Sequence, residues 1–171
     1  TDYEDLMKVI DSLRIHCKGS DKYDNERIGM NSRLDTLQAA VLIEKLKIFA
    51  DEIEARNVVA ARYAARLGKT VVCPTIPANN ISSWAQYTVL VDNAAVRKKL
   101  QGDLQAKGIP TAVYYPIPLH RQVAYRMFPH DPQGMAVSDD LCHRVVSLPM
   151  HPYLSERDQD LICEAVRASL G

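Results

Sequence analysis

A long stretch without helix breakers dominates this sequence. Residues 35–67 contain neither proline nor glycine, the two residues that most often end a helix. The pattern therefore predicts one helix from about residue 35 to Leu67, with Gly68 ending it. A helix of roughly 30 residues would be about 45 Å long. A chain of 171 residues built around such a helix can hold one domain, or one domain with an appendage.

The first half of this predicted helix is apolar over most of its circumference, whereas the second half has a single apolar face. A helix that is apolar nearly all round is buried between layers or between subunits. Left uncovered, it would expose a contiguous apolar surface, so we expect a dimer or a larger assembly. The apolar residues of the first half are Leu34, Leu37, Ala39, Ala40, Val41, Leu42, Ile43 and Leu46.

Shorter elements of both kinds flank the long helix. Apolar spacing predicts helices over 2–18, 93–108, 138–146 and 155–170, the last capped by Ser155. Branched and aromatic residues predict strands over 70–74, 83–91 and 109–115, and a short extended piece over 147–152. Loops are expected over 19–29 and 116–134. This order of helices and strands along the chain predicts an α+β fold. In such a fold a small sheet carries helices on one face beside the long helix.

The bulk composition excludes several classes of function. The chain has 21 Lys and Arg against 21 Asp and Glu, so it lacks the cationic surplus of a general nucleic-acid or membrane-surface binder. No apolar run approaches the roughly 20 residues that span a bilayer. The four cysteines are widely spaced and form no C-x-x-C pair, so they are interpreted as buried thiols in a reducing compartment. We therefore expect a cytoplasmic protein.

The usual catalytic and metal-binding patterns are missing from the sequence. Cys142, His143 and His151 lack the paired short spacings of a structural zinc site, so no metal is expected. Adjacent His16 and Cys17 cannot face one site on a helix. The sequence has no G-x-S-x-G motif and no glycine-rich loop that could cradle a phosphate. No catalytic residue is assigned within this chain.

Asn31 and Arg33 stand just before the long helix. Residues Ser32 to Asp35 match a capping box, in which the Ser32 hydroxyl would cap the helix and leave Asn31 outside it. A turn asparagine and a surface arginine explain the pair simply, and the local pattern alone favours that interpretation. The alternative is an anion site, because an amide and a guanidinium beside a helix N-terminus suit a phosphate or a carboxylate.

A second group of polar side chains lies in the segment TAVYYPIPLHRQ. Tyr114, Tyr115 and His120 crowd around two prolines at the end of a predicted strand. Prolines stiffen a loop, so these side chains would be held in place at low entropic cost. A rigid surface turn and a loop that contacts a ligand both remain open.

Four segments together resemble the DegT/StrS-type nucleotide-sugar aminotransferases, which use pyridoxal phosphate (PLP). They are DSLRIHCKG, RIGMNSRLDTLQAAVLIEKL, TAVYYPIPLHRQVAY and VVSLPMHPYLS, and they cover nearly the whole chain in order. The stretch KGSDKYDNERIGMNSRLDTLQAA is most similar to the branch that aminates UDP-linked 3-oxo uronic acids for surface polysaccharides. The resemblance implies the small C-terminal domain of a PLP enzyme of the aspartate-aminotransferase type.

The resemblance also implies roles for the two polar groups. Asn31 would bind the phosphate of the cofactor held by the partner subunit of a homodimer, and Arg33 would contact the nucleotide sugar. Tyr114, Tyr115 and His120 would supply further substrate contacts, with Tyr114 the least conforming because many relatives have His there. The complete enzyme would move an amino group, usually from glutamate, to a keto-sugar nucleotide.

This chain is shorter than the family's members. The resemblance implies that the Schiff-base lysine lies upstream of the matched part, so the chain alone is expected to be inactive. Residues 1–30 would be a remnant of the large domain, 31–68 the interface helix and 69–171 the small domain. A non-catalytic binding or dimerisation module remains the alternative function. A nucleotide-sugar enzyme of another chemistry would need its own acid and base, and the sequence offers no such carboxylate pair.

Overall fold

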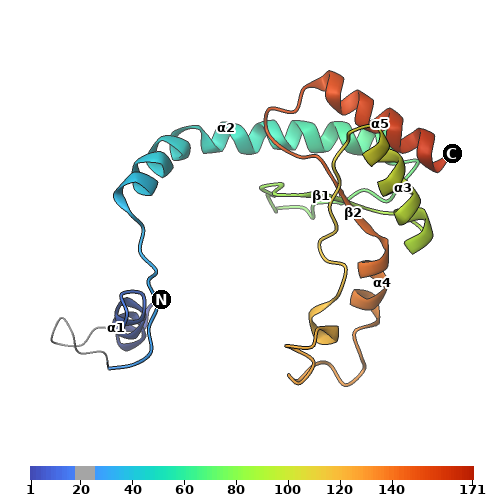
Figure 1. The fold of residues 1–171 in the computed structure, drawn as a ribbon. Helices are drawn as coiled ribbons and strands as arrows, with labels where there is room; N and C mark the ends of the chain where they lie inside the picture. The colour runs from blue at the N-terminus through green and yellow to red at the C-terminus, as the bar shows by residue number, and fades with distance from the viewer. Residues whose placement is uncertain (18–25) are drawn as a thin grey trace. The chain divides into compact units, whose positions relative to one another are not determined.

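The computed structural model describes residues 1–17 and 26–171, so most of the loop expected over 19–29 lies outside the described residues. The described chain forms two compact units, Thr1–Ile48 and Phe49–Gly171 (Figure 1). Helix α2 (Thr36–Leu67) begins in the first unit and ends in the second. The division expected from the sequence, into 1–30, 31–68 and 69–171, stays a prediction.

Helix α2 confirms the predicted long helix, but its first turn differs from the prediction. The Asp35 carboxylate accepts the Gln38 amide at 2.8 Å, so Asp35 caps the helix. The predicted capping box headed by Ser32 is therefore wrong. The Ser32 amide instead donates to the Arg14 carbonyl at 2.8 Å, which holds Ser32 in a strand-like pairing. At the other end the Gly68 amide donates to the Ala64 carbonyl at 3.0 Å.

The first unit also contains helix α1 (Glu4–Leu13), which is shorter than the helix predicted over 2–18. His16 and Cys17 have φ angles of 69° and 54°, and this left-handed backbone cannot continue a right-handed helix. The chain turns there, and Ile15 forms an antiparallel bridge with Asn31. The pairing brings the end of α1 alongside the segment that leads into α2.

The second unit has the predicted α+β character with a smaller sheet than expected. Strand β1 (Tyr87–Leu90) pairs antiparallel with β2 (Val145–Leu148), and helices α3 (Ala94–Ala106), α4 (Ala136–Arg144) and α5 (Glu156–Leu170) complete the unit. The strands predicted over 70–74 and 109–115 are wrong as strands, because each makes only an isolated bridge. These bridges join Val72 to Leu90 and Ala112 to Ser147.

The predicted Ser155 cap is confirmed in this unit, and α3 begins at a cap that was not predicted. The Ser155 hydroxyl accepts the Asp158 amide at 3.1 Å at the start of α5. At the start of α3 the Asn93 side chain accepts two backbone amides, each at 3.0 Å. Gly108 follows α3 with a φ of 72°, a left-handed conformation that glycine adopts without strain. Both helices lie within the ranges that the sequence predicts.

One hydrophobic core joins the second half of α2 to α3, α5 and the sheet. Tyr63 of α2 stacks on Tyr87 of β1 with 4.8 Å between ring centroids. Helix α5 lies along the end of α2 (Figure 1), where the buried Gln159 amide donates to the Val59 carbonyl at 2.7 Å. The fully buried side chains of this core include Tyr63, Leu67, Tyr87, Val89, Leu100, Leu104, Val146, Cys163 and Val166.

Three further observations concern thiols, metals and membranes. All four cysteines have free thiols, of which those of Cys17, Cys142 and Cys163 are buried and that of Cys73 is partly buried. Within residues 1–17 and 26–171, no group of three His, Cys, Asp or Glu side chains is arranged to hold a metal ion. No helix in that part of the chain is both long enough and apolar enough to cross a membrane.

Candidate functional site

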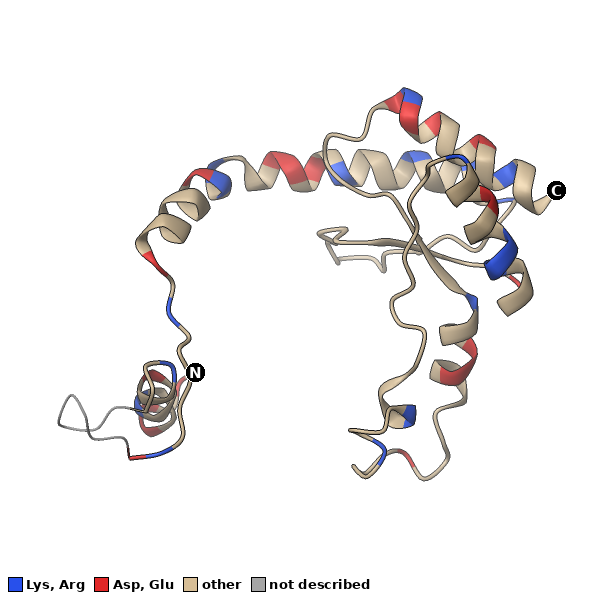
Figure 2. Ribbon diagram, in the orientation of Figure 1, with Lys and Arg blue, Asp and Glu red and all other residues tan. Residues whose placement is uncertain are grey.

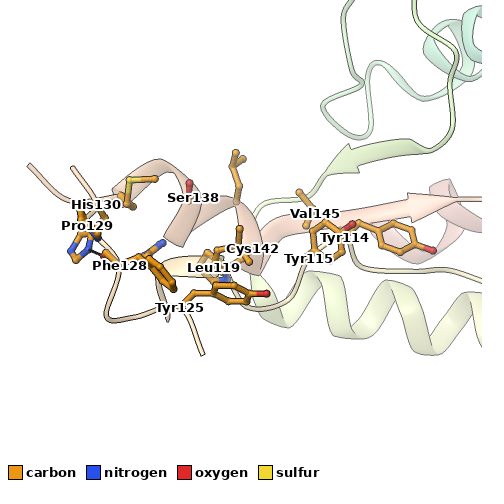
Figure 3. A pocket seen from close by; sticks show the side chains of 14 residues that line it. Tyr114, Tyr115, Leu119, Tyr125, Phe128, Pro129, His130, Ser138, Cys142 and Val145 are labelled. Atoms are coloured by element: carbon orange, nitrogen blue, oxygen red, sulfur yellow. Dashed lines mark hydrogen bonds between the residues drawn. The ribbon is translucent and has the colours of Figure 1, made fainter. Parts of the chain in front are cut away.

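The predicted site residues form two groups, one in each compact unit. Asn31 and Arg33 are neighbours in the first unit. Tyr114, Tyr115 and His120 line one cavity of about 580 Å³ in the second unit (Figure 3). The members of each group lie close together in the structure.

The side chains of Asn31 and Arg33 are joined by a hydrogen bond. The Nε of Arg33 donates to the Oδ1 of Asn31 at 2.9 Å, and both residues are exposed. This bond engages the Asn31 oxygen, and the Asn31 amide nitrogen and the Arg33 terminal nitrogens remain as donors that can meet a ligand. A pair rich in donors suits a phosphate or a carboxylate.

The helix N-terminus contributes less to this site than the sequence suggested. Helix α2 begins at Thr36, and the Asp35 carboxylate already accepts the Gln38 amide. A carboxylate at the first turn occupies an amide and offsets the positive end of the helix dipole. The donors available to an anion are therefore side chains, chiefly those of Asn31 and Arg33.

The cavity in the second unit lies between the loop 114–130 and helix α4. Tyr114 and Tyr115 pack edge to face, with 5.7 Å between centroids, at one end of it. Figure 3 shows Phe128, Pro129 and His130 at the other end, with Tyr125 between the two ends. An apolar and aromatic lining with a few polar tips is typical of pockets that bind small organic ligands.

His120 lies in this cavity with one ring nitrogen held by a carboxylate. Its Nε2 is 2.9 Å from the Oδ1 of Asp139, which also accepts the Nε of Arg121 at 2.9 Å. The Arg121 guanidinium, and then the His120 ring, lower the pKa of Asp139 to about 2 against the opposing effect of desolvation. The ionised carboxylate can only accept, so the Nε2 of His120 donates to it.

The sequence did not predict Asp139 or the far end of the cavity. Asp139 is 19 residues from His120 and belongs to no motif that links the two. Tyr125, Phe128 and His130 lie in a segment for which the sequence predicted only a loop. A local pattern has no signal for such neighbours, because the return of the chain through α4 brings them together.

Comparison with known proteins identifies the chain's relatives. The profile of the DegT/DnrJ/EryC1/StrS aminotransferase family matches residues 1–167. UDP-2-acetamido-2-deoxy-3-oxo-D-glucuronate aminotransferase of Pseudomonas aeruginosa is 45% identical over 168 residues, which are 97% of this chain and 45% of that protein.

Two solved structures show the same fold. A DegT DnrJ EryC1 StrS aminotransferase from Brucella abortus is 50% identical with a TM-score of 0.89, and the match covers 100% of this chain and 45% of that one. DesV of S. venezuelae, solved in complex with a ketimine intermediate, is 29% identical with a TM-score of 0.83, covering 98% and 45%.

The chain thus spans about half the length of the relatives that it matches. The family's aminotransferases depend on PLP, and solved structures with this fold include PLP-bound and PMP-bound forms. The matches extend over nearly all of the sequence, as did the four segments on which the resemblance rested. This chain belongs to the DegT/DnrJ/EryC1/StrS aminotransferase family.

Proposed function

We propose that this chain is the C-terminal portion of a PLP-dependent aminotransferase that transfers an amino group from glutamate to a keto-sugar nucleotide. A UDP-linked 3-oxo uronic acid, used to build surface polysaccharide, is the proposed acceptor. The observation that carries this proposal is the 45% identity, over 97% of the chain, to an enzyme named for that class of substrate. The enzyme would work in the cytoplasm as a homodimer.

The residues of this chain fit the phosphate of the cofactor. Asn31 and Arg33 present several N–H donors side by side, with the Asn31 oxygen engaged by the Nε of Arg33. We assign Asn31 to the phosphate of the PLP held by the partner subunit, and Arg33 to the nucleotide sugar. When bound, PLP supplies the electron sink that amino-group transfer requires.

The cavity of the second unit would receive part of the nucleotide sugar. Tyr114 and Tyr115 offer hydroxyl groups and ring faces, and the His120 ring offers its Nδ1 for a polar contact. Asp139 would hold the orientation of the His120 ring through its Nε2. These side chains bind and orient the substrate, and none of them forms or breaks the bonds of the transferred amino group.

We further propose that the reactive lysine lies outside this chain. The residues that line the cavity include no lysine. Of the described lysines, Lys47 pairs with Glu44 and Lys99 pairs with Asp103. The chain alone would therefore be inactive, with 1–30 belonging to the large domain, 31–68 forming the interface helix and 69–171 the small domain.

The intact mass of the natural gene product tests this division first. A polypeptide of about twice the 19.2 kDa of this chain would support it. A natural product of 19.2 kDa would contradict it and leave a binding or dimerisation module as the function. Assay of the purified natural product for glutamate-dependent amination of UDP-linked 3-oxo sugars then tests the activity.

Two substitutions in the full-length protein separate the proposed roles. Asn31→Ala should lower PLP retention during dialysis, because it removes a phosphate donor. Arg33→Ala should raise the KM for the nucleotide sugar by roughly tenfold or more, since a lost hydrogen bond to a charged group costs about 1.5–3 kcal/mol, while the KM for glutamate changes less. Lys98→Ala, at an exposed position on α3, is the control. Unchanged kinetics in both variants would remove the assignment.

A further inference from the structure

Gly29 is packed against the turn that follows helix α1. A Cβ atom added to Gly29 would lie 2.3 Å from the backbone nitrogen of Cys17 and 2.4 Å from the carbonyl carbon of His16. Both contacts are with backbone, so no change of side-chain rotamer can make room. Glycine alone fits this close approach of two chain segments.

The close approach brings the two segments within hydrogen-bond distance on both sides of Asn31. The Met30 amide donates to the Leu13 carbonyl at 2.9 Å. The Ser32 amide donates to the Arg14 carbonyl at 2.8 Å. Asn31 therefore lies between two backbone anchors that depend on the separation of the segments, and this separation is set at Gly29.

The turn on the other side of the contact is itself strained. His16 and Cys17 both have left-handed backbone, which L-residues adopt only at an energetic cost. The Cys17 side chain is completely buried, and its amide donates to the Ser12 carbonyl at 2.7 Å. The turn is thus held in place and cannot move away from a side chain at position 29 without losing these interactions.

We propose that Gly29 is a positioning residue for the anion site formed by Asn31 and Arg33. It lets the segment 30–33 close against the end of α1, and this closure sets where the Asn31 amide is presented. The inference rests on the function proposed for the pair, and it adds a residue that touches neither cofactor nor substrate.

Hydrogen exchange in the full-length protein tests the positioning directly. In Gly29→Ala, the Met30 and Ser32 amides should exchange at least about tenfold faster, because their bonds to the end of α1 open. Gly102→Ala is the matched control, since a Cβ at Gly102 meets nothing within 4 Å. Unchanged protection of the two amides in Gly29→Ala would overturn the inference, whatever the enzyme's activity.

Cofactor retention then tests whether the positioning acts through Asn31. Gly29→Ala should lose PLP on dialysis about as readily as Asn31→Ala, and the double variant should lose little more than either single variant. Losses that add in the double variant, or full retention in Gly29→Ala beside loss in Asn31→Ala, would overturn the inference. A wild-type protein that neither holds PLP nor transfers an amino group would instead refute the proposed function, and hydrogen exchange would still decide the role of Gly29.

Discussion

The carboxylate of Asp139 organises one end of the cavity at the scale of single residues. It accepts hydrogen bonds from the Nε and a terminal nitrogen of Arg121 at 2.9 and 2.7 Å. It also accepts a hydrogen bond from the His120 ring. A two-pronged guanidinium contact of this kind fixes the carboxylate in orientation as well as in charge. The orientation of the histidine in the cavity therefore depends on a residue that contacts no ligand in the proposed mechanism.

We expect the stability contributed by Asp139 to vanish in acid. The pKa of Asp139 is lowered from 3.8 to about 2, first by Arg121. A carboxyl group with a lowered folded-state pKa stabilises the fold above its unfolded pKa and loses this contribution as the pH falls through the folded pKa. The difference in unfolding free energy between wild type and Asp139→Asn should be constant near neutral pH and shrink between about pH 4 and about pH 2.

Urea unfolding at a series of pH values measures this difference. Glu54→Gln, at an exposed position on α2, serves as the control and should show a smaller dependence. A difference for Asp139→Asn that persists undiminished to pH 2 would mean that the ion pair with Arg121 is not the source of the contribution.

Two stacked tyrosines of the core offer a second prediction. Tyr63 donates its hydroxyl to the Pro149 carbonyl at 2.9 Å, whereas the buried Tyr87 hydroxyl has no partner at hydrogen-bond distance among the described residues. Burial raises the pKa of Tyr87, so its hydroxyl stays protonated. Tyr63→Phe should lower the free energy of unfolding by about 1 kcal/mol, and Tyr87→Phe by less. Equal losses in chemical denaturation would contradict this.

At the scale of elements, the helix ends decide where the site segments begin. Helices α3 and α5 start at an Asn and a Ser that accept backbone amides, as local rules predict. Helix α2 is capped by Asp35, because the Ser32 backbone is hydrogen-bonded to the end of α1 instead. The shift leaves residues 31–34 outside the helix, so their conformation depends on the neighbouring segment.

The choice of cap can be tested with two alanine variants. Asp35→Ala should destabilise the first turn of α2 by about 1 kcal/mol, because the Gln38 amide loses its partner. Ser32→Ala should leave that turn nearly unchanged. Exchange of the Gln38 amide, compared between the two variants and wild type, is the measurement. A larger effect on this amide from Ser32→Ala than from Asp35→Ala would support the capping box headed by Ser32.

At the scale of the whole molecule, the first half of α2 needs a covering surface. Leu37, Val41 and Leu46 are 81%, 63% and 68% exposed. The sequence has no charged residue between Asp35 and Glu44, and Figure 2 shows an uncharged stretch near the start of α2. Apolar surface of this extent on one helix is typical of a protein interface, which agrees with the homodimer proposed above.

We expect a charge in this stretch to weaken association. Burying one leucine contributes about 1.5–3 kcal/mol, so Leu37→Glu with Leu46→Glu should raise the dimer dissociation constant of the full-length protein at least about tenfold. Val58→Glu, at a position 61% exposed in the second half of α2, is the control and should have little effect. Sedimentation velocity at micromolar concentration measures the shift. A wild-type monomer at that concentration would refute the interface.

The sequence by itself determined the features that depend on neighbours along the chain. The length of α2 follows from the absence of proline and glycine, and the cap at Ser155 follows from a side chain that bonds to an amide three residues on. The two polar groups were also identified from their motifs, because the residues of each lie within a few positions of one another. All of these are local interactions, which short patterns encode.

Only the tertiary structure decided the features that depend on distant partners. Strand length over 70–74 and 109–115 was overestimated, because pairing requires a neighbouring strand that branched residues alone cannot supply. Asp35 replaced Ser32 as the cap because Ser32 pairs with the end of α1. Two contacts join segments that are distant along the chain, namely the bond of His120 to Asp139 and the close approach of Gly29 to His16. The spacing of residues in the sequence does not predict such contacts.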